Sequence, residues 1–342
     1  MAVAGGAPAV SARALHFVLP NGNVQPEFLD AVRSLPGVEL ELVEGWQELA
    51  PAEIAAKVRG CDVLLASRAP AVPDELAGDP GRLKYICYLH GTMRGRIGLP
   101  VIRSGVRVTN WGNAPGRGLA EGSLTLLLAV LRDLPRRVLA VRDGAGRGIR
   151  SMGGSVARLN VGVYGFGFAG REFVKLLAPF GSCIRVFDPY ATDLPEGCIR
   201  AGSLRELFSA SQAIVIHAGL TDETAGSVSR ELLAKLPDGG IVINTARGAI
   251  VDQEALFDEL RSGRLRAGLD VLWPDDLPPD HEARQWENLI WTCHEFAGRP
   301  WPGEGVEGVL DGYRVHLDNL RAFVEGRPLE HVIDETRYAR MT

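Results

Sequence analysis

Residues 159–170, LNVGVYGFGFAG, decide how this chain is expected to fold. They begin as a short apolar strand and end in three glycines, Gly165, Gly167 and Gly170, spaced as G-x-G-x-x-G. A segment with the apolar periodicity of a helix follows at residues 171–180. Strand, tight glycine turn and helix together present unpaired backbone N–H groups and the positive end of a helix dipole at one point, where a pyrophosphate can bind.

The glycine pattern is weak support by itself, because the chain contains 41 glycines and a plain strand–helix turn has the same form. The residues that follow strengthen it. A second apolar strand is expected at residues 183–187, and Asp188 stands at its carboxyl end, 18 residues after Gly170. This is close to the spacing of about 20 residues expected for a carboxylate that binds the adenosine ribose. The sequence therefore predicts a dinucleotide-binding domain.

Asp188 also indicates which dinucleotide binds. Its carboxylate would repel the 2′-phosphate of NADP, and the next residues, Pro189 and Tyr190, supply no cation to accept that phosphate. We therefore expect NAD, and not NADP, as the cofactor.

Composition restricts the class of protein. A chain of 342 residues is long enough for two domains with separate cores, and 46% hydrophobic with 23% charged residues is ordinary for a globular protein. A net charge of −5 argues against binding to nucleic acid or to an anionic membrane, and no apolar run is long enough to span a bilayer. The small-residue-rich start, MAVAGGAPAVSAR, is interpreted as a frayed leader and not as a targeting signal.

Five cysteines are scattered along the chain, without a C-x-x-C pair or a Cys/His spacing typical of a metal site. An odd number of cysteines without a secretory signal is typical of reduced thiols. We therefore expect a cytoplasmic protein that holds no metal.

Strand-like and helix-like segments alternate in both halves of the chain, which is typical of parallel sheets covered by helices on both faces. In the first half, we expect strands at residues 15–19, 38–43, 62–66, 83–89 and 106–109, and helices at 26–35, 51–58, 73–77 and 99–104. In the second half, we expect further strands at 160–164, 213–217, 241–244, 267–272 and 289–292, and helices at 121–132 (with a continuation towards 139), 230–236 and 253–262.

The order of these segments predicts two doubly wound α/β domains. The turn signal at residues 113–116 is expected to be the crossover between them. The amphipathic stretch 306–324 is expected to return to the first domain, followed by a polar tail. The predicted domains are therefore residues 1–117 with 299–342, which form a discontinuous substrate domain, and residues 118–298, which bind NAD.

Polar side chains follow strands of the second domain, where ligands bind in open α/β sheets. Arg247 follows the strand 241–244, and its planar guanidinium suits a carboxylate or a polarised carbonyl. By itself, a solvated surface arginine would be the simpler interpretation. Asp270 ends a strand near the expected position of the nicotinamide ribose.

A histidine and an acidic pair complete the candidate site. Asp275 and Asp276 lie in a proline-bounded loop, where two aspartates are also typical of an ordinary turn. His294 ends an apolar strand, and it becomes a general acid/base if a carboxylate fixes its tautomer. With Arg247, this set suits hydride transfer between nicotinamide and the carbinol carbon of a 2-hydroxy acid.

These residues make the chain resemble the D-isomer-specific 2-hydroxyacid dehydrogenase family, from about residue 83 to residue 329. The motifs that carry the resemblance are VYGFGFAGREF in the nucleotide loop, HAGLTDETAG after the third strand, INTARGAIVDQEAL around the arginine and GLDV before the acid. The resemblance implies two Rossmann-like or flavodoxin-like parallel-sheet domains with a cleft between them. It also implies NAD as cofactor and usually a homodimer.

The resemblance further implies roles for individual residues. Arg247 would grip the substrate, and His294, supported by Asp275, would be the acid/base. A turn containing Gly91, Thr92 and Met93 would offer backbone N–H groups to the substrate carboxylate. The cofactor would be bound by Gly165, Gly167, Phe168, Ala169, Gly170, Asp188, His217, Thr245, Ala246 and Asp270.

The chain departs from the family pattern mainly in the substrate half. Asp275 stands where the family usually has glutamate, and its shorter side chain would reach His294 only if the loop lies closer; Asp276 is the alternative partner. Met93 replaces a common glycine of the substrate turn, and Glu295 adds a negative charge beside the site. These departures suggest an unusual substrate or weakened catalysis.

Two other functions stay open at this point. An NAD(H)-binding sensor or corepressor-like interaction protein would fit the altered acid and substrate turn, although the retained Arg247 and His294 argue against lost chemistry. A formate- or phosphite-type dehydrogenase is the second alternative. Formate enzymes of the family carry glutamine at the acid position, where this chain has Asp275.

Overall fold

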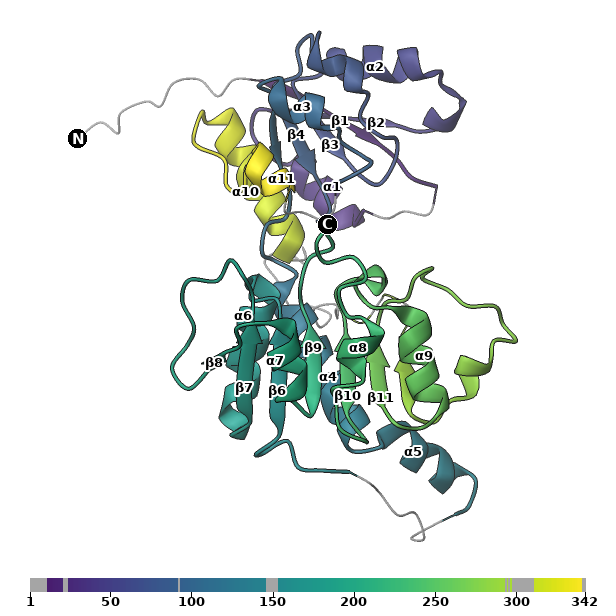
Figure 1. The fold of residues 1–342 in the computed structure, drawn as a ribbon. Coiled ribbons are helices and arrows are strands. Elements are labelled where there is room, and N and C mark those ends of the chain that lie inside the picture. The colour runs from purple at the N-terminus through teal and green to yellow at the C-terminus, as the bar shows by residue number, and fades with distance from the viewer. Residues whose placement is uncertain are drawn as a thin grey trace, which may run out of the picture. The chain divides into compact units, whose positions relative to one another are not determined.

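The computed structural model describes residues 11–20, 24–91, 93–145, 153–292, 294, 296 and 311–339. The chain forms two compact units, each built around its own parallel sheet (Figure 1). Unit 1 is Met1–Ala114 with Pro300–Thr342, and unit 2 is Pro115–Arg299.

Unit 1 contains a sheet of five parallel strands, β1 (Ala12–Phe17), β2 (Val38–Val43), β3 (Val63–Ala66), β4 (Tyr85–Tyr88) and β5 (Arg107–Thr109). Their order in the sheet is β2-β1-β3-β4-β5. The register pairs Ala12 with Val38 on one side of β1 and Ala14 with Val63 on the other. This is the flavodoxin-like doubly wound order, in which the sheet grows first to one side of β1 and then to the other.

The helices of unit 1 are α1 (Pro26–Arg33), α2 (Pro51–Arg59), α3 (Leu99–Arg103), α10 (Asp311–Val324) and α11 (Glu335–Ala339). Both α1 and α2 begin with proline, which suits the first turn because no intrahelical N–H bond is lost there. One apolar cluster joins the sheet to α1 and α10, and a second joins it to α2 and α3. Phe28 of α1 stacks on Tyr313 of α10, so α10 packs in unit 1, to which its position after the nucleotide-binding segment led us to assign it.

The polar segment after α10 packs back on unit 1. Val332 forms an antiparallel bridge with Thr109, and the hydroxyl of Tyr338 in α11 donates to the carbonyl of Ile97 (2.8 Å). The sequence does not predict α11, because a helix of five residues is too short to show a period. Similarly, the helix expected at residues 73–77 is a single 3₁₀ turn, Asp74–Ala77.

Unit 2 contains seven parallel strands, β6 (Asn160–Tyr164), β7 (Cys183–Phe187), β8 (Ile199–Arg200), β9 (Ala213–Ile216), β10 (Ile241–Asn244), β11 (Arg266–Leu269) and β12 (Leu289–Trp291). Their order is β12-β11-β10-β9-β6-β7-β8. Strand β6 pairs with both β7 and β9, so the growth of the sheet reverses at β6, as in a Rossmann fold. Ligands bind at such a reversal, outside the carboxyl ends of the strands.

The helices of unit 2 are α4 (Gly116–Leu131), α5 (Leu134–Arg142), α6 (Phe168–Leu177), α7 (Leu204–Ser209), α8 (Arg230–Leu233) and α9 (Gln253–Arg261). Helix α4 starts five residues earlier than the sequence predicts. It does not continue to Leu139, because Asp133 adopts a left-handed conformation (φ 50°) and Pro135 cannot extend the preceding helix. The short elements α7 and β8 are not predicted from the sequence.

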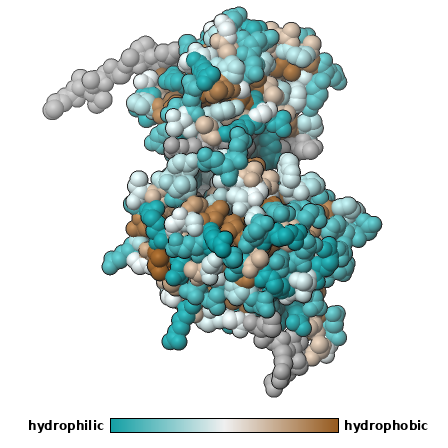
Figure 2. Space-filling model, in the orientation of Figure 1, coloured by the Kyte–Doolittle hydropathy of each residue, from teal (hydrophilic) through white to brown (hydrophobic). Residues whose placement is uncertain are grey.

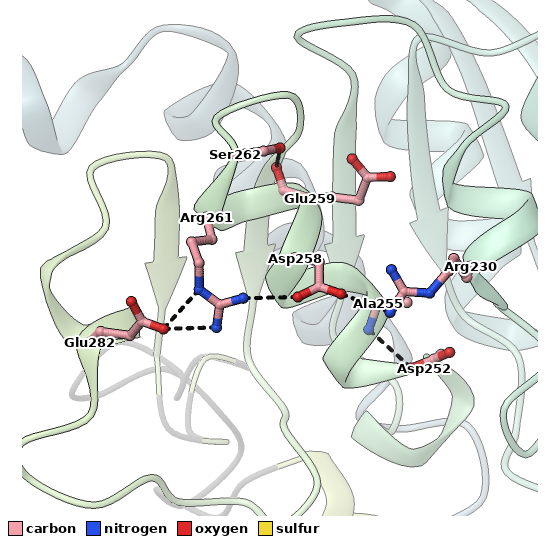
Figure 3. Close-up of polar contacts among 8 residues, drawn as sticks. All are labelled: Arg230, Asp252, Ala255, Asp258, Glu259, Arg261, Ser262 and Glu282. Carbon is pink, nitrogen blue, oxygen red and sulfur yellow. Dashed lines mark hydrogen bonds and ion pairs between the residues drawn. The ribbon is translucent and has the colours of Figure 1, made fainter.

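A chain of exposed ion pairs runs across α9 (Figure 3). Arg230 pairs with Asp258 (2.8 Å), Asp258 with Arg261 (2.8 Å), and Arg261 with Glu282 (2.7 Å). Each exposed pair contributes less than about 1 kcal/mol to stability. Their joint effect is to tie Glu282, which lies between β11 and β12, to α9. Asp275 and Asp276 lie in the same segment between β11 and β12, here called the acidic loop. The ion pairs across α9 therefore help to fix the position of this loop.

Most of the surface visible in Figure 2 is hydrophilic, with hydrophobic side chains in small patches on both units. The exposed hydrophobic residues of unit 2 include four on α5, namely Leu134, Val138, Leu139 and Val141. No helix in the described part of the chain is long and apolar enough to cross a bilayer.

Buried histidines link stability to pH in both units. Burial, with the nearby His90 and His331, lowers the pKa of His316 on α10 to about 3, and its Nδ1 lies 3.3 Å from the Sγ of Cys87. Burial lowers the pKa of His217, which follows β9, to about 4. Both imidazoles are therefore neutral in the folded protein at neutral pH.

We expect the free energy of unfolding to fall as the pH drops from about 6.5 to about 4, because the unfolded chain then binds protons that the folded His217 and His316 do not. Each histidine would contribute up to about 3 kcal/mol to this loss. Thermal unfolding followed across this pH range measures the slope. His217→Gln should reduce the slope, and a variant with the wild-type slope would contradict the assignment.

Candidate active site

The nucleotide loop of unit 2 has the geometry that a bound pyrophosphate needs. A Cβ atom on Gly165 (φ 93°) would lie 2.3 Å from the backbone N of Ala218, and one on Gly170 would lie 2.3 Å from the carbonyl O of Gly165. These two glycines are therefore required by packing within the protein. A Cβ on Gly167 would meet nothing within 4 Å, so the middle glycine borders open space at the start of α6. The loop thus fits the diphosphate of a dinucleotide.

Asp188 is held against this loop by backbone N–H groups. Its Oδ2 accepts from Phe166 N (2.6 Å), and its Oδ1 accepts from Tyr190 N (2.8 Å) and Ala191 N (3.0 Å). The carboxylate at the end of β7 is therefore fixed beside the glycine turn that ends β6. This is the position from which it can bind the ribose hydroxyls of a dinucleotide.

Three other residues predicted to bind cofactor differ in exposure. Phe168 and Ala169 lie in the first turn of α6, and Phe168 is 40% exposed with its ring against Gly116. The Nε2 atom of His217 is buried, and its ring lies 5.3 Å from that of Phe173. Its backbone N donates to Tyr164 O (2.7 Å), which ties the carboxyl end of β9 to that of β6.

The turn after β10 is organised by a residue that the sequence analysis did not select. Asn244 donates through Nδ2 to Arg247 O (2.9 Å) and accepts through Oδ1 from Ala246 N (3.0 Å). Thr245 is tied to α4, because its Oγ1 lies 2.7 Å from the Oγ of Ser123. The signal for Asn244 was its position at a strand end, where a short amide side chain can bond the backbone of the following turn.

Arg247 is presented at the carboxyl edge of the sheet by this turn. Its Nη1 donates to Ala246 O (2.6 Å), and the side chain is largely buried. Burial lowers its pKa, while the negative charge of Asp275 acts in the opposite direction. The guanidinium remains charged in any case, since arginine does not deprotonate in proteins.

His294 and Asp275 lie together, as the sequence analysis expects. The Nδ1 of His294 is 3.1 Å from Asp275 Oδ2, although both side chains are partly exposed. Asp276 points elsewhere, because its Oδ1 accepts from Nη2 of Arg284 (2.9 Å) and from Leu277 N (2.8 Å). Asp275, although shorter than a glutamate, therefore reaches the imidazole of His294. Asp276 is bound to Arg284 instead.

Asp270 organises the segment that carries His294. It is buried, and its Oδ1 accepts from Thr292 Oγ1 (2.6 Å) and Phe296 N (3.1 Å), while its carbonyl accepts from His294 N. His294 itself has a left-handed backbone (φ 61°), which these bonds on both sides hold in place. Thr292 and Phe296 were not selected from the sequence, since nothing in the pattern connects them to Asp270.

The predicted substrate turn lies in unit 1. Gly91 accepts from Asn110 Nδ2 (3.1 Å), and a Cβ on Gly91 would lie 2.8 Å from Nε1 of Trp111. The side chain of Met93 is fully buried in the core, so Met93 can offer a ligand only its backbone. Thr92 lies outside the described residues.

No group of three or more His, Cys, Asp or Glu side chains is placed to hold a metal ion in the part of the chain that the structure describes.

Comparisons with known proteins identify the class to which this fold and site belong. The profile of "D-isomer specific 2-hydroxyacid dehydrogenase, NAD binding domain" matches residues 124–295. The hydroxypyruvate reductase of Thermotoga maritima is 32% identical over 269 residues, which cover 75% of this chain and 84% of the relative. The TT0316 protein from Thermus thermophilus has a solved structure that covers 94% of this chain and 99% of its own, with 30% identity and a TM-score of 0.75.

The chain therefore belongs to the D-isomer specific 2-hydroxyacid dehydrogenase family and is an NAD-dependent oxidoreductase. The D-3-phosphoglycerate dehydrogenase of Methanocaldococcus jannaschii is a further relative, 28% identical over 280 residues. These residues cover 78% of this chain but only 51% of that protein, so the chain spans about half the length of the phosphoglycerate dehydrogenase.

Gly167→Ala should leave folding intact but weaken NADH binding by at least about tenfold, or about 1.4 kcal/mol, because the added methyl group takes the space where the diphosphate approaches. Isothermal titration measures the affinity, and thermal unfolding checks the fold. Gly154→Ala is the matched control in the same unit, since its Cβ would meet only Leu131 Cδ1, at 3.4 Å. Equal affinities in the two variants would contradict the placement of the diphosphate.

Proposed function

We propose that this protein reduces a 2-oxo acid to the D-2-hydroxy acid, or catalyses the reverse oxidation, with Arg247, Asp275 and His294 as its reactive residues. The observation that supports this most directly is the 3.1 Å contact between His294 Nδ1 and Asp275 Oδ2. Asp275 is also close enough to Arg247 for its negative charge to raise the pKa of the guanidinium. Arg247, Asp275 and His294 thus follow three consecutive strands of the sheet, β10, β11 and β12, at the edge where the nucleotide loop also lies.

His294 moves the proton. In the direction of reduction, the carbonyl oxygen at C2 takes a proton from Nε2 of the imidazolium as C2 receives a hydride, and the imidazole is left neutral. The nicotinamide, when bound, supplies or accepts that hydride. Asp275, on Nδ1, fixes the imidazole tautomer and stabilises the protonated ring. In the direction of oxidation, the same nitrogen takes the hydroxyl proton.

Arg247 binds the substrate. Its planar fork suits the carboxylate at C1 and places a positive charge beside the carbonyl oxygen at C2, which gains negative charge as the hydride arrives. Because Arg247 is largely buried, little water competes for that carboxylate. The contribution of Gly91, Thr92 and Met93 through their backbone N–H groups stays a prediction.

The names of the relatives suggest where to look for the substrate. The relatives from Thermotoga maritima and Methanocaldococcus jannaschii are named for hydroxypyruvate and D-3-phosphoglycerate, which are small three-carbon acids. We propose a small 2-oxo acid of this kind, with hydroxypyruvate as the first compound to test. The cytoplasmic location stays a prediction from the unpaired cysteines.

We also propose that the protein is a homodimer that uses α5. Leu134, Leu139 and Val141 on this helix are 51%, 55% and 64% exposed. With Val138, four large aliphatic side chains are exposed on these nine residues, which is costly in water, and a second copy would bury them by a symmetric contact.

His294→Ala should lower kcat by about 10² to 10⁴ while NADH affinity is largely kept, because only the proton transfer is lost. Asp275→Asn should lower kcat by a smaller factor, and Asp275→Glu should retain turnover. Asp276→Asn is the matched control, since that carboxylate contacts Arg284 and not His294. Steady-state rates of NADH oxidation with hydroxypyruvate measure all four.

Two results would contradict the proposal. His294→Ala with wild-type turnover would exclude this residue as the acid/base. Wild-type protein that binds NADH but oxidises it with none of a panel of 2-oxo acids would favour the sensor over the enzyme.

Replacing Leu139 and Val141 together by aspartate should convert the dimer into a monomer, because two charges would then be buried in the contact. Light scattering after size-exclusion chromatography measures the mass. Ile199→Asp is the control, as Ile199 is 42% exposed on β8 in the same unit. A wild-type protein that is already a monomer would refute the dimer.

A further inference from the structure

A second carboxylate lies near Asp188, the residue expected to bind the adenosine ribose. Tyr190 follows β7, and its hydroxyl donates to Oε2 of Glu223 (3.1 Å), which lies in the loop after β9. The backbone N of Tyr190 donates to Asp188 Oδ1 (2.8 Å). One tyrosine therefore connects the two acids, with Asp188 at its backbone and Glu223 at its phenol.

The turn that carries Glu223 is closed by hydrogen bonds on both sides of this residue. Thr221 N donates to Thr224 Oγ1 (2.7 Å), and Thr224 Oγ1 donates to Gly219 O (2.6 Å). Gly226 N then donates to Ala249 O (2.8 Å), which anchors the end of the loop. Asp222 precedes Glu223 in this turn and is equally exposed.

The charges of Asp188 and Glu223 converge on one buried group. The phenol of Tyr164, at the end of β6, lies 3.0 Å from Ser227 Oγ. Burial raises the pKa of Tyr164 most, and both Asp188 and Glu223 raise it further. The two carboxylates therefore act on the same small region beside the nucleotide loop.

The nearby cation best suited to bind a 2′-phosphate, Arg171, is already paired with a carboxylate. Arg171, in the first helix after the glycine loop, places its guanidinium over the ring of Phe166, 4.5 Å from the ring centre. Its Nη1 and Nη2 donate to the two carboxylate oxygens of Asp193 (3.1 and 3.0 Å). Its charge is thus neutralised by a bidentate pair.

We propose that Glu223 is a second residue that selects NAD against NADP, acting together with Asp188. This inference rests on Asp188 binding the adenosine ribose. A 2′-phosphate carries a charge of about −1.5 to −2 at neutral pH and would replace a hydroxyl next to Asp188. The negative charge of Glu223 would repel this phosphate, as that of Asp188 would. The phosphate would also find the Tyr190 hydroxyl, which could otherwise donate to it, already bound to Glu223.

The experiment is direct titration with NADH and with NADPH by calorimetry, so that it does not depend on turnover. We expect Glu223→Gln to lower the ratio of the NADPH and NADH dissociation constants by about five- to tenfold, and Glu223→Lys to lower it further. Added salt should reduce the effect, because these groups are exposed. NADH binding in each variant shows that the nucleotide site is intact.

Asp222→Asn and Asp222→Lys are the matched controls, since they make the same charge changes one residue away, whereas the Tyr190 hydroxyl donates to Glu223. A ratio that changes no more in the Glu223 variants than in the Asp222 variants would overturn the inference. Failure of the catalytic proposal would look different, because wild-type protein would then bind NADH strongly without oxidising it.

Discussion

Parallel strand pairing is the constraint on which the rest of unit 2 depends. Because β6 pairs in parallel with both β7 and β9, and β10 and β11 continue the same sheet, the carboxyl ends of all these strands lie at one edge. The glycine loop, Asp188, Arg247 and Asp270 each follow one of these strands directly. Residues that are far apart in the sequence are thereby brought to one edge, without any contact specific to the site.

Arg247 and His294 are fixed at that edge by short-range hydrogen bonds from buried or constrained groups. Asn244 closes the turn that presents Arg247, and Asp270 bonds both flanks of His294. A buried carboxylate such as Asp270 is costly unless it is satisfied, so its bonds to Thr292 and to the backbone of residue 296 are strongly favoured. The left-handed backbone of His294 is tolerated because these bonds hold it.

The acidic loop illustrates how a departure from a family pattern is accommodated. Aspartate is shorter than glutamate by about one C–C bond, yet Asp275 contacts His294 because the loop lies close enough. Arg284 helps to hold the loop there, since it pairs with Asp276 and places its guanidinium over the ring of Trp291. The ion pairs across α9 hold the other end of the same segment. Aspartate at position 275, in place of the glutamate usual in the family, therefore still contacts His294.

The sequence by itself determined the fold class, the strands β6, β7 and β10, the glycine loop and the family, because these depend on local periodicity and on glycine spacing. It also selected His294 and Asp275, but it left Asp276 as an alternative partner. Only the tertiary structure decided between the two acids, since the choice depends on Arg284, which occupies one of them. It likewise decided the break between α4 and α5, the buried side chain of Met93 and the link from Tyr190 to Glu223. The burial of Met93 and the link from Tyr190 to Glu223 depend on contacts between residues far apart in the chain, which no local pattern encodes. The break between α4 and α5 depends on the left-handed backbone of Asp133, which residue types alone do not reveal.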